Sequence, residues 1–279
     1  MPERDTSTAK LARFYGEMSP TLETVKESLA VAGIDPEQPR ASDLYERDID
    51  CHNLGMYRML ERLAEIVAEY GAPTGYDAVL DLGCGIGGPS RFLADRFGCS
   101  VLGVDLLSLR IELAEALAEL TNVRGRVSYR VADATNLDLP DESCDQVWML
   151  DVSMHIRDKR ALFSEIARVL RPDGLMVMHE QTGPLPAAMR PVMRQAPYIA
   201  PSLPQLIRYV ENTVLRTLTW RDTTSFVIEY FLKMRNLVLN ASESQDSRRQ
   251  TGIPILDGYI ETLAHLGGRT GALIAKRTG

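Results

Sequence analysis

One short segment constrains the fold of this chain more than any other. Residues 79–90 read VLDLGCGIGGPS. The apolar start predicts a buried strand, and the polar end at Ser90 predicts the beginning of a helix. Between them, Gly83, Gly85 and Gly88 fit the spacing G-x-G-x-x-G, which lets bare backbone approach a ligand. The segment therefore predicts a strand–turn–helix unit that binds a ligand at its turn.

The acid before the first glycine narrows the choice of ligand. Proteins that bind NAD, FAD or S-adenosylmethionine (SAM) share the glycine spacing, so the spacing alone leaves the ligand open. The phosphates of a dinucleotide would be repelled by Asp81, whereas the ammonium of a methionine moiety would be attracted. Asp81 therefore favours SAM.

Two further predicted strands end in an acid. Residues 100–105 end at Asp105, and the strand over 126–132 is followed by Asp133. The carboxyl ends of parallel strands meet at the edge where an open α/β sheet binds its ligand. We therefore expect Asp81, Asp105 and Asp133 to lie around one site.

The chain alternates strands and helices between residues 78 and 180. The expected strands are 78–82, 100–105, 126–132, 144–150 and 175–180, and the expected helices are 90–97, 108–120 and 160–170. Such alternation predicts a parallel sheet with right-handed crossovers. The pattern resumes late in the chain with a strand at 214–223, helices at 225–240 and 255–266, and a strand at 270–276.

Four zones follow from this pattern. They are an N-terminal helical cap (1–75), the ligand-binding core (76–180), a lid (181–212) and a C-terminal completion of the sheet (213–279). The lid carries six prolines, together with Met189, Met193, Tyr198 and Ile199. A long irregular insertion in a compact domain is usually functional or disordered, so we expect it to enclose an apolar acceptor molecule.

Charge and composition exclude several classes of partner. The net charge of −7 disfavours a partner that is held through its phosphates, so we expect no nucleic acid. No stretch is apolar enough to span a bilayer, and no secretory signal is recognisable, so we expect a cytoplasmic protein without a membrane partner. The four cysteines lack metal-type spacing and are expected to be free thiols. We expect no metal, and a homodimer is one alternative for the oligomeric state.

The motifs around Asp81, Asp105 and Asp133 resemble those of class I SAM-dependent methyltransferases, over roughly residues 75 to 180. The resemblance implies a Rossmann-like sheet with helices on both faces and SAM as cofactor. In that family the glycine loop cradles the methionine part, the second acid binds the ribose hydroxyls and the third receives the adenine amino group. The positions that the resemblance assigns to SAM are Asp81, Gly83, Cys84, Gly85, Gly88, Asp105, Leu106, Asp133, Ala134 and Asp151.

A finer likeness lies in residues 148–159, WMLDVSMHIRDK. This segment is similar to one in the small-molecule methyltransferases of the sarcosine/dimethylglycine and sterol type, and natural-product tailoring methyltransferases share their architecture. The likeness implies a small-molecule acceptor that is methylated on carbon or nitrogen, such as an indole or an amine.

Four residues are candidates for handling or orienting the acceptor. His155 follows the fourth strand and is a natural base near neutral pH, although a role in the pocket wall is an equal alternative. Glu180 ends the fifth strand and could hold a cationic amine or take a proton; the alternative is a salt bridge beneath the lid. Tyr45 and His52 lie in a polar segment of the cap, where orienting SAM or the acceptor is expected.

Three other activities stay open at this point. An O-methyltransferase would keep the same cofactor site and act on a phenol or alcohol. A cyclase or binding protein of the same fold could keep every cofactor residue without transferring a methyl group. An NAD-dependent oxidoreductase would share the glycine loop and Asp105, but it would not explain Asp81 or Asp133.

Overall fold

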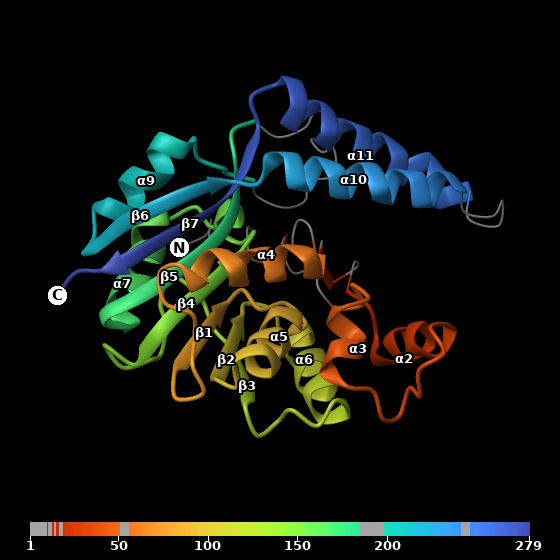
Figure 1. The fold of residues 1–279 in the computed structure, drawn as a ribbon, viewed down its shortest axis with the longest axis horizontal. Coiled ribbons are helices and arrows are strands. Elements are labelled where there is room, and N and C mark those ends of the chain that lie inside the picture. The colour runs from red at the N-terminus through yellow and green to blue at the C-terminus, as the bar shows by residue number, and fades with distance from the viewer. Residues whose placement is uncertain are drawn as a thin grey trace.

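A computed structural model of the chain describes residues 10, 13, 15, 16, 19–50, 56–184, 198–240 and 246–279. Helices cover both faces of a central sheet (Figure 1). The strands are β1 (Ala78–Leu82), β2 (Ser100–Asp105), β3 (Val127–Val131), β4 (Cys144–Leu150), β5 (Leu170–Thr182), β6 (Leu215–Asp222) and β7 (Arg269–Arg277). The helices are α2 (Leu22–Val31), α3 (Ala41–Tyr45), α4 (Met56–Ala68), α5 (Gly88–Phe97), α6 (Ser108–Leu120), the 3-10 turn η1 (Ser153–His155), α7 (Lys159–Val169), α9 (Leu203–Glu211), α10 (Thr224–Asn240) and α11 (Asp246–His265).

Across the described residues, the sheet has 7 strands in the order β3-β2-β1-β4-β5-β7-β6. Strands β1 to β5 are parallel, as the alternating sequence pattern predicts. Strand β7 runs antiparallel between β5 and β6. The strand order reverses between β1 and β4, and such a switch point leaves a crevice at the carboxyl ends of the strands.

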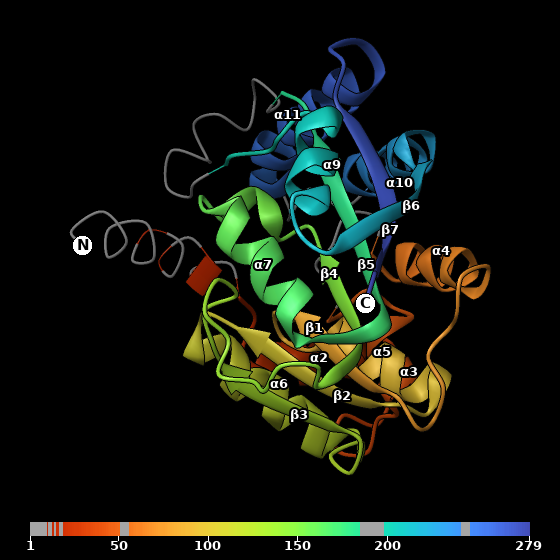
Figure 2. The ribbon, with the colours of Figure 1, turned by 90° about the vertical axis from the view of Figure 1, so that its left-hand side faces the viewer.

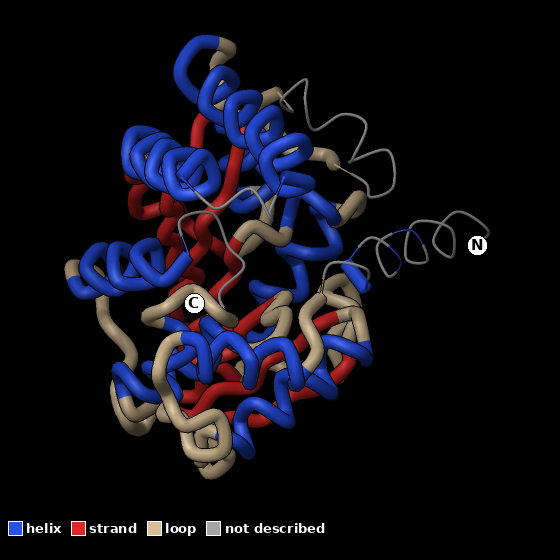
Figure 3. The backbone as a smooth tube through the Cα atoms, turned by 90° about the vertical axis from the view of Figure 1, so that its right-hand side faces the viewer, coloured by secondary structure: helices blue, strands red, loops and turns tan. Residues whose placement is uncertain are grey.

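The two faces of the sheet carry separate cores. One core joins the sheet to α4, α5 and α10, and includes Phe92, Trp148 and Val227. The other joins it to α7 and α9, and includes Phe163 and Leu206. Figure 2 shows α7 and α9 on one side of the strands and α4 on the other. Figure 3 shows the strands between helices from the opposite side.

A buried ion pair attaches the N-terminal cap to the glycine loop. Arg91 in α5 donates from Nη2 and Nε to the Asp50 carboxylate, at 2.7 and 3.0 Å, and both side chains are fully buried. The same guanidinium donates to the carbonyl oxygens of Ile86 (2.7 Å) and Ala114 (3.3 Å). Arg91 thus ties the cap, the loop and α6 together, because a buried guanidinium needs a partner for each donor.

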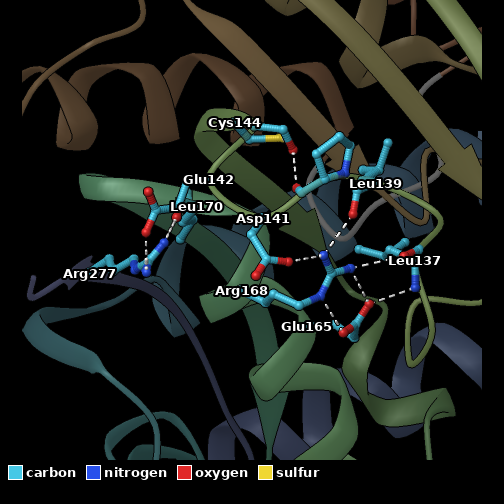
Figure 4. Close-up of polar contacts among 11 residues, drawn as sticks. Leu137, Leu139, Asp141, Glu142, Cys144, Glu165, Arg168, Leu170 and Arg277 are labelled. Carbon is cyan, nitrogen blue, oxygen red and sulfur yellow. Dashed lines mark hydrogen bonds and ion pairs between the residues drawn. The ribbon is translucent and has the colours of Figure 1, made fainter.

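A second arginine fixes the segment between β3 and β4 (Figure 4). Arg168 in α7 donates to Glu165 (2.8 Å), Asp141 (2.8 Å) and the carbonyls of Leu137 (2.9 Å) and Leu139 (2.7 Å). The carboxylate of Glu165 accepts in turn from the backbone N–H of Leu137 at 2.7 Å. The loop that begins at the end of β3 is therefore held against α7.

Most predicted elements are confirmed to within two residues, and three differ. Strand β5 is longer than predicted, because its first part pairs with the start of β4. Helix α11 begins at Asp246 rather than at 255; it continues through Pro254, which the sequence pattern treated as a boundary. The end of the predicted lid is the regular helix α9, whose Ser202 capping box and N-terminal proline start it, and whose Leu206 is fully buried.

Cys84, Cys99 and Cys144 are free and buried, as expected, while Cys51 lies outside the described residues. Met189 and Met193 of the predicted lid also lie outside them. In the part of the chain that the structure describes, no helix has the length and apolar character needed to cross a bilayer.

The buried ion pair predicts a large effect on stability. Asp50→Ala should lower the free energy of unfolding by about 3 to 5 kcal/mol, because it leaves the Arg91 guanidinium buried without its carboxylate. Urea denaturation measures the change. Asp257→Ala is the matched control, since it removes an exposed ion pair with Arg235 that should contribute about 0 to 1 kcal/mol. Equal changes in the two variants would contradict a structural role for the buried pair.

Candidate functional site

A cleft lies at the carboxyl ends of β1, β2, β3 and β4, beside the switch point of the sheet. It brings together the glycine loop and most of the acids that the sequence singled out. The residues that line it are Tyr15, Asp50, Asp81, Leu82, Gly83, Cys84, Gly85, Ile86, Pro89, Val104, Asp105, Leu106, Leu107, Arg110, Ala132, Asp133, Ala134, Leu150, Asp151, Val152, His155 and Ile156.

The glycine loop needs its glycines for two different reasons. Gly83 has φ +79°, and a Cβ there would lie 2.4 Å from a methyl of Val152. Gly85 has φ +57°, a conformation that other residues rarely adopt, with Arg110 nearby. The loop is held to β2 by the N–H groups of Gly83 and Cys84, which donate to the Val104 carbonyl at 2.8 and 2.9 Å. The loop backbone therefore forms one bare wall of the cleft.

Asp81 is an almost fully buried acid of the cleft. Its Oδ2 accepts a hydrogen bond from the Ser90 hydroxyl at 2.5 Å. Burial raises the pKa of the Asp81 carboxyl to about 7, and the charge of Asp105 adds to the rise. A bound cation would favour the ionised form of this carboxyl, so the site suits an ammonium group.

Asp105 is held by the backbone on both sides. Oδ2 accepts from the N–H of Gly85 and Oδ1 from the N–H of Leu107, each at 3.0 Å. Each carboxylate oxygen can accept a further hydrogen bond, so the side chain is oriented and still able to bind hydroxyl groups. Leu106, predicted beside it, also lines the cleft.

Asp133 occupies the exposed rim. Its Oδ1 accepts from the N–H and the hydroxyl of Thr135, at 2.8 and 2.7 Å. These hydrogen bonds are those of an acid that stabilises a turn. Asp133 and Ala134 nevertheless line the cleft, next to the loop that Arg168 fixes.

Cys84 is a packing residue in the loop. Burial raises the pKa of its thiol well above the ordinary value, and Asp81 and Asp105 raise it further. A thiol in this setting stays protonated and unreactive.

Asp151 has an unusual backbone conformation at the end of β4. Its φ is +56°, which is uncommon for a residue other than glycine. Its Oδ1 lies 3.1 Å from Nδ1 of His179, and Nε2 of that imidazole lies 3.1 Å from the Thr223 hydroxyl. The turn at Asp151 leads directly into η1, which carries His155.

His155 faces a tyrosine that sequence reasoning missed. Nε2 of His155 lies 2.5 Å from the Tyr15 hydroxyl, and the two rings meet edge to face with centroids 5.3 Å apart. The Arg110 guanidinium lies over the Tyr15 ring, 4.4 Å from the ring centroid. Burial raises the pKa of the Tyr15 phenol, although Arg110 opposes the shift, so the hydroxyl stays protonated. His155 and Tyr15 both line the cleft.

A buried lysine fixes the turn that carries His155. The Lys159 ammonium donates to the carbonyls of Ser153 and Ile156, each at 2.5 Å. Burial lowers its pKa to about 8, while the nearby Glu180 carboxyl opposes the shift. No sequence signal distinguishes this residue from a solvated lysine at the start of a helix.

Three predicted site residues do not reach the lining of the cleft, and the position of a fourth is not described. Gly88 is the first residue of α5, directly behind the loop. Tyr45 is buried against Phe92, and its hydroxyl donates to Asp95 at 2.5 Å, which places it in the core rather than at the acceptor. Glu180 is fully buried behind the cleft. His52 lies outside the described residues.

The described residues contain no group of three or more His, Cys, Asp or Glu side chains arranged to hold a metal ion.

Residues 80–178 match the family model described as a methyltransferase domain. This match confirms the methyltransferase resemblance that the motifs around Asp81, Asp105 and Asp133 predicted. The chain is 34% identical over 145 residues to a protein from Oryza sativa subsp. japonica assigned as a tocopherol O-methyltransferase, covering 50% of this chain and 40% of that one. It is 35% identical over 107 residues to the sterol 24-C-methyltransferase of Eremothecium gossypii, covering 38% and 29%. The chain thus spans less than half the length of these relatives.

Solved structures share the fold of the methyltransferase domain. A Galdieria sulphuraria protein assigned as a sarcosine dimethylglycine methyltransferase matches with a TM-score of 0.70 and 22% identity, over 79% of this chain and 86% of that one. The geranyl diphosphate C-methyltransferase of Streptomyces coelicolor A3(2), in complex with S-adenosyl-L-homocysteine, matches at 0.66 and 21%, over 80% and 82%. The [4+2]-cyclase SpnF matches at 0.66 and 18%, over 93% and 98%. These likenesses confirm the predicted fold.

The chemistry of the cleft fits SAM. SAM carries a sulfonium and an ammonium, and the cleft of the methyltransferase domain offers Asp81, Asp105, Asp133 and Asp151. Its loop backbone is bare at Gly83, where a Cβ would fill the space beside Val152. Acids and exposed backbone together suit a cationic amino-acid nucleoside better than a chain of phosphates.

The burial of Glu180 predicts a pH-dependent cost to stability. Burial raises the pKa of this carboxyl to about 8, and Asp151 adds to the shift. The folded state therefore holds the proton more tightly than the unfolded state, and stability falls as the pH rises from about 4.5 to about 8. Glu180→Gln should match the wild type at pH 4.5 and exceed its stability by a few kcal/mol at pH 8.5, as measured by urea denaturation.

Glu165→Gln is the control with the opposite sign. The bonds from Arg168 lower the pKa of the Glu165 carboxyl, so its contribution is present above about pH 4.5 and is lost as the pH falls through its folded pKa. This variant should be less stable than the wild type at pH 8.5. A Glu180→Gln variant that also loses stability at pH 8.5 would show that the buried carboxylate is favourably paired.

Proposed function

We propose that this protein transfers the methyl group of SAM to a nucleophilic carbon or nitrogen of a small, largely apolar metabolite. The observation that carries the proposal is the convergence of the strand-end acids and the glycine loop on one cleft whose far end holds His155 and Tyr15. The matches to methyltransferases, including a sterol 24-C-methyltransferase, support it.

The residues of the cleft divide into roles along its length. In this proposal, Asp81 and the loop backbone at Gly83 and Gly85 bind the methionine part of SAM. Asp105 binds the ribose hydroxyls, and Asp133 receives the adenine amino group. Asp81 is buried, so water screens the attraction of its carboxylate for a cation only weakly. Asp105 is oriented by two backbone N–H groups. When bound, SAM supplies a methyl group that its sulfonium already activates.

Positioning is the main contribution that the chain itself has to make. Holding an acceptor in line with an activated methyl group can supply about 7 to 11 kcal/mol in favourable cases. His155 is the candidate for orienting the acceptor or removing its proton, since it lines the cleft and is a base near neutral pH. Tyr15 orients the imidazole through the 2.5 Å contact, and Lys159 fixes the turn beneath it.

The three alternative activities differ from methyl transfer to carbon or nitrogen in the product or the cofactor that an experiment would detect. An O-methyltransferase differs only in the acceptor atom, and the relative assigned as a tocopherol O-methyltransferase keeps it open. A cyclase would bind SAM and return a product without an added methyl group; the shared fold of SpnF supports that alternative. An NAD-dependent oxidoreductase would bind NADH in place of SAM. Incubating a metabolite extract with methyl-labelled SAM, followed by mass spectrometry, distinguishes transfer from the rest.

The ribose role of Asp105 is directly testable. Asp105→Ala should weaken SAM binding by about 1 to 3 kcal/mol, the value of a lost charge-assisted hydrogen-bond site. Isothermal titration calorimetry measures the affinity, with NADH as the competing ligand and Asp257→Ala as the control. Unchanged SAM affinity in a folded Asp105→Ala protein would remove Asp105 from the site, and tighter binding of NADH than SAM would overturn the cofactor.

The role of His155 predicts a loss of turnover without a loss of SAM. His155→Ala should lower kcat by about 10² to 10⁴ if the imidazole moves a proton, and Tyr15→Phe should lower it less, because the imidazole remains. SAM affinity, measured in parallel, should hold in both. His265→Ala is the control, since that imidazole is exposed at the end of α11. Wild-type turnover in both variants would leave positioning by other residues as the mechanism.

A further inference from the structure

A completely buried histidine holds the carboxylate of Asp151 at the wall of the cleft. Oδ1 of Asp151 lies 3.1 Å from Nδ1 of His179 in β5, and the His179 side chain is fully buried. A carboxylate only accepts hydrogen bonds, so Nδ1 carries the hydrogen and donates it to Asp151. The backbone adds a second tie, because the N–H of Asp151 donates to the His179 carbonyl at 2.9 Å. The side chain and the main chain of Asp151 are thus both fixed to β5.

The imidazole is itself anchored behind the cleft. Its Nε2 lies 3.1 Å from the Thr223 hydroxyl, and that hydroxyl lies 3.0 Å from the Thr270 hydroxyl in β7. His179, Thr223 and Thr270 are all buried, and none of them is among the described residues that line the cleft. A site group is held in one direction when its partner is locked by packing and by further hydrogen bonds. His179 can therefore set the direction of the Asp151 carboxylate without touching a ligand.

Asp151 lies where two parts of the cleft meet. It lines the cleft, and its side chain is only 10% exposed. The next residue, Val152, packs on Gly83 of the glycine loop, and His155 follows at the end of η1. Under the proposed function the loop binds the cofactor and His155 faces the acceptor. The transferred methyl group must then lie at this junction, beside Asp151.

The other acids of the cleft have different partners. Under the proposed function, Asp81 binds the ammonium of SAM, Asp105 the ribose hydroxyls and Asp133 the adenine amino group. Asp50 is neutralised by its buried ion pair. The ammonium, ribose and adenine are the same in SAM and in its product, S-adenosylhomocysteine (SAH). Asp151 is thus the acid of the described lining that is placed to respond to the charge on sulfur.

We propose that His179 positions the Asp151 carboxylate to face the positive charge on the sulfur of SAM, so that the cleft favours SAM over SAH. This inference rests on the proposed function for the identity of the cofactor and for the direction in which it lies. A carboxylate that is shielded from water attracts a nearby cation strongly. When the methyl group leaves, the electron pair of the C–S bond stays on sulfur and the charge is lost. The same carboxylate then attracts the product less, which favours its release.

The test compares the affinities of SAM and SAH for the full chain by isothermal titration calorimetry. Asp151→Asn removes the charge and keeps the size of the side chain. It should weaken the binding of SAM about tenfold or more and leave the affinity for SAH unchanged, because SAH carries no charge on sulfur. Asp81→Asn should weaken the binding of both ligands by the same factor, since both carry the ammonium.

The positioning role of His179 needs a matched pair of variants. His179→Leu removes both ring nitrogens and should lower the SAM-to-SAH affinity ratio in the same direction as Asp151→Asn. His179→Asn keeps an N–H that can replace the Nδ1 donor, and it should restore part of the ratio. A merely structural role would change the affinities for SAM and SAH alike. Asp257→Asn is the control, because Asp257 is an exposed partner of Arg235.

Two results would overturn the inference. The first is an Asp151→Asn protein that binds SAH and keeps the wild-type ratio, or that loses SAM and SAH equally. The second is a ratio that stays at the wild-type value in His179→Leu, which would remove His179 from the positioning of Asp151. The affinity for SAH reports in each case whether the variant is folded.

The outcome is separable from that of the proposed function. A wild-type ratio in Asp151→Asn, in a protein that transfers the methyl group of labelled SAM, would overturn the inference alone. A ratio that depends on Asp151 and His179, in a protein that transfers no methyl group, would support the inference and overturn the transferase. A wild-type protein that binds neither SAM nor SAH would overturn both.

Discussion

The geometry of the cleft depends on the buried ion pair between Arg91 and Asp50. Its two charges are fully removed from water, so each side chain is stable only while the other stays in place. Arg91 also holds the Ile86 carbonyl of the glycine loop, and Asp50 is itself part of the cleft lining. The N-terminal cap is therefore a structural support of the glycine loop. A change in the cap should alter the position of that loop and so weaken cofactor binding.

The local part of the site could be predicted from the sequence. Asp81, Gly83 and Asp105 lie at the ends of strands that their own apolar neighbours define, so a pattern of a few residues locates them. The same local reasoning does not distinguish Tyr45 from Asp50, because a polar-rich segment does not reveal which of its residues faces the cleft. Asp50, from the same segment, lines the cleft, while the Tyr45 ring is buried against Phe92 and its hydroxyl donates to the exposed Asp95.

The acceptor end depends on contacts that the sequence does not encode locally. Tyr15 and His155 are separated by 140 positions, and only the folded chain brings their rings together. Lys159 looks like an ordinary first residue of a helix until its ammonium is seen between two carbonyls. Glu180 could be located near a strand end, but its complete burial is visible only in the folded chain.

Asp151 links the two ends of the site, and its left-handed backbone follows from that position. The chain must leave β4 sharply enough for Val152 to pack on Gly83 and for His155 to turn back towards the cleft. An aspartate tolerates this conformation better than most residues, and its carboxylate gains the contact with His179. Strain at a single residue is thus offset by a polar contact to the next strand. The same turn sets the distance between the glycine loop and the His155 imidazole, so under the proposed function the backbone of Asp151 sets the spacing on which methyl transfer would depend.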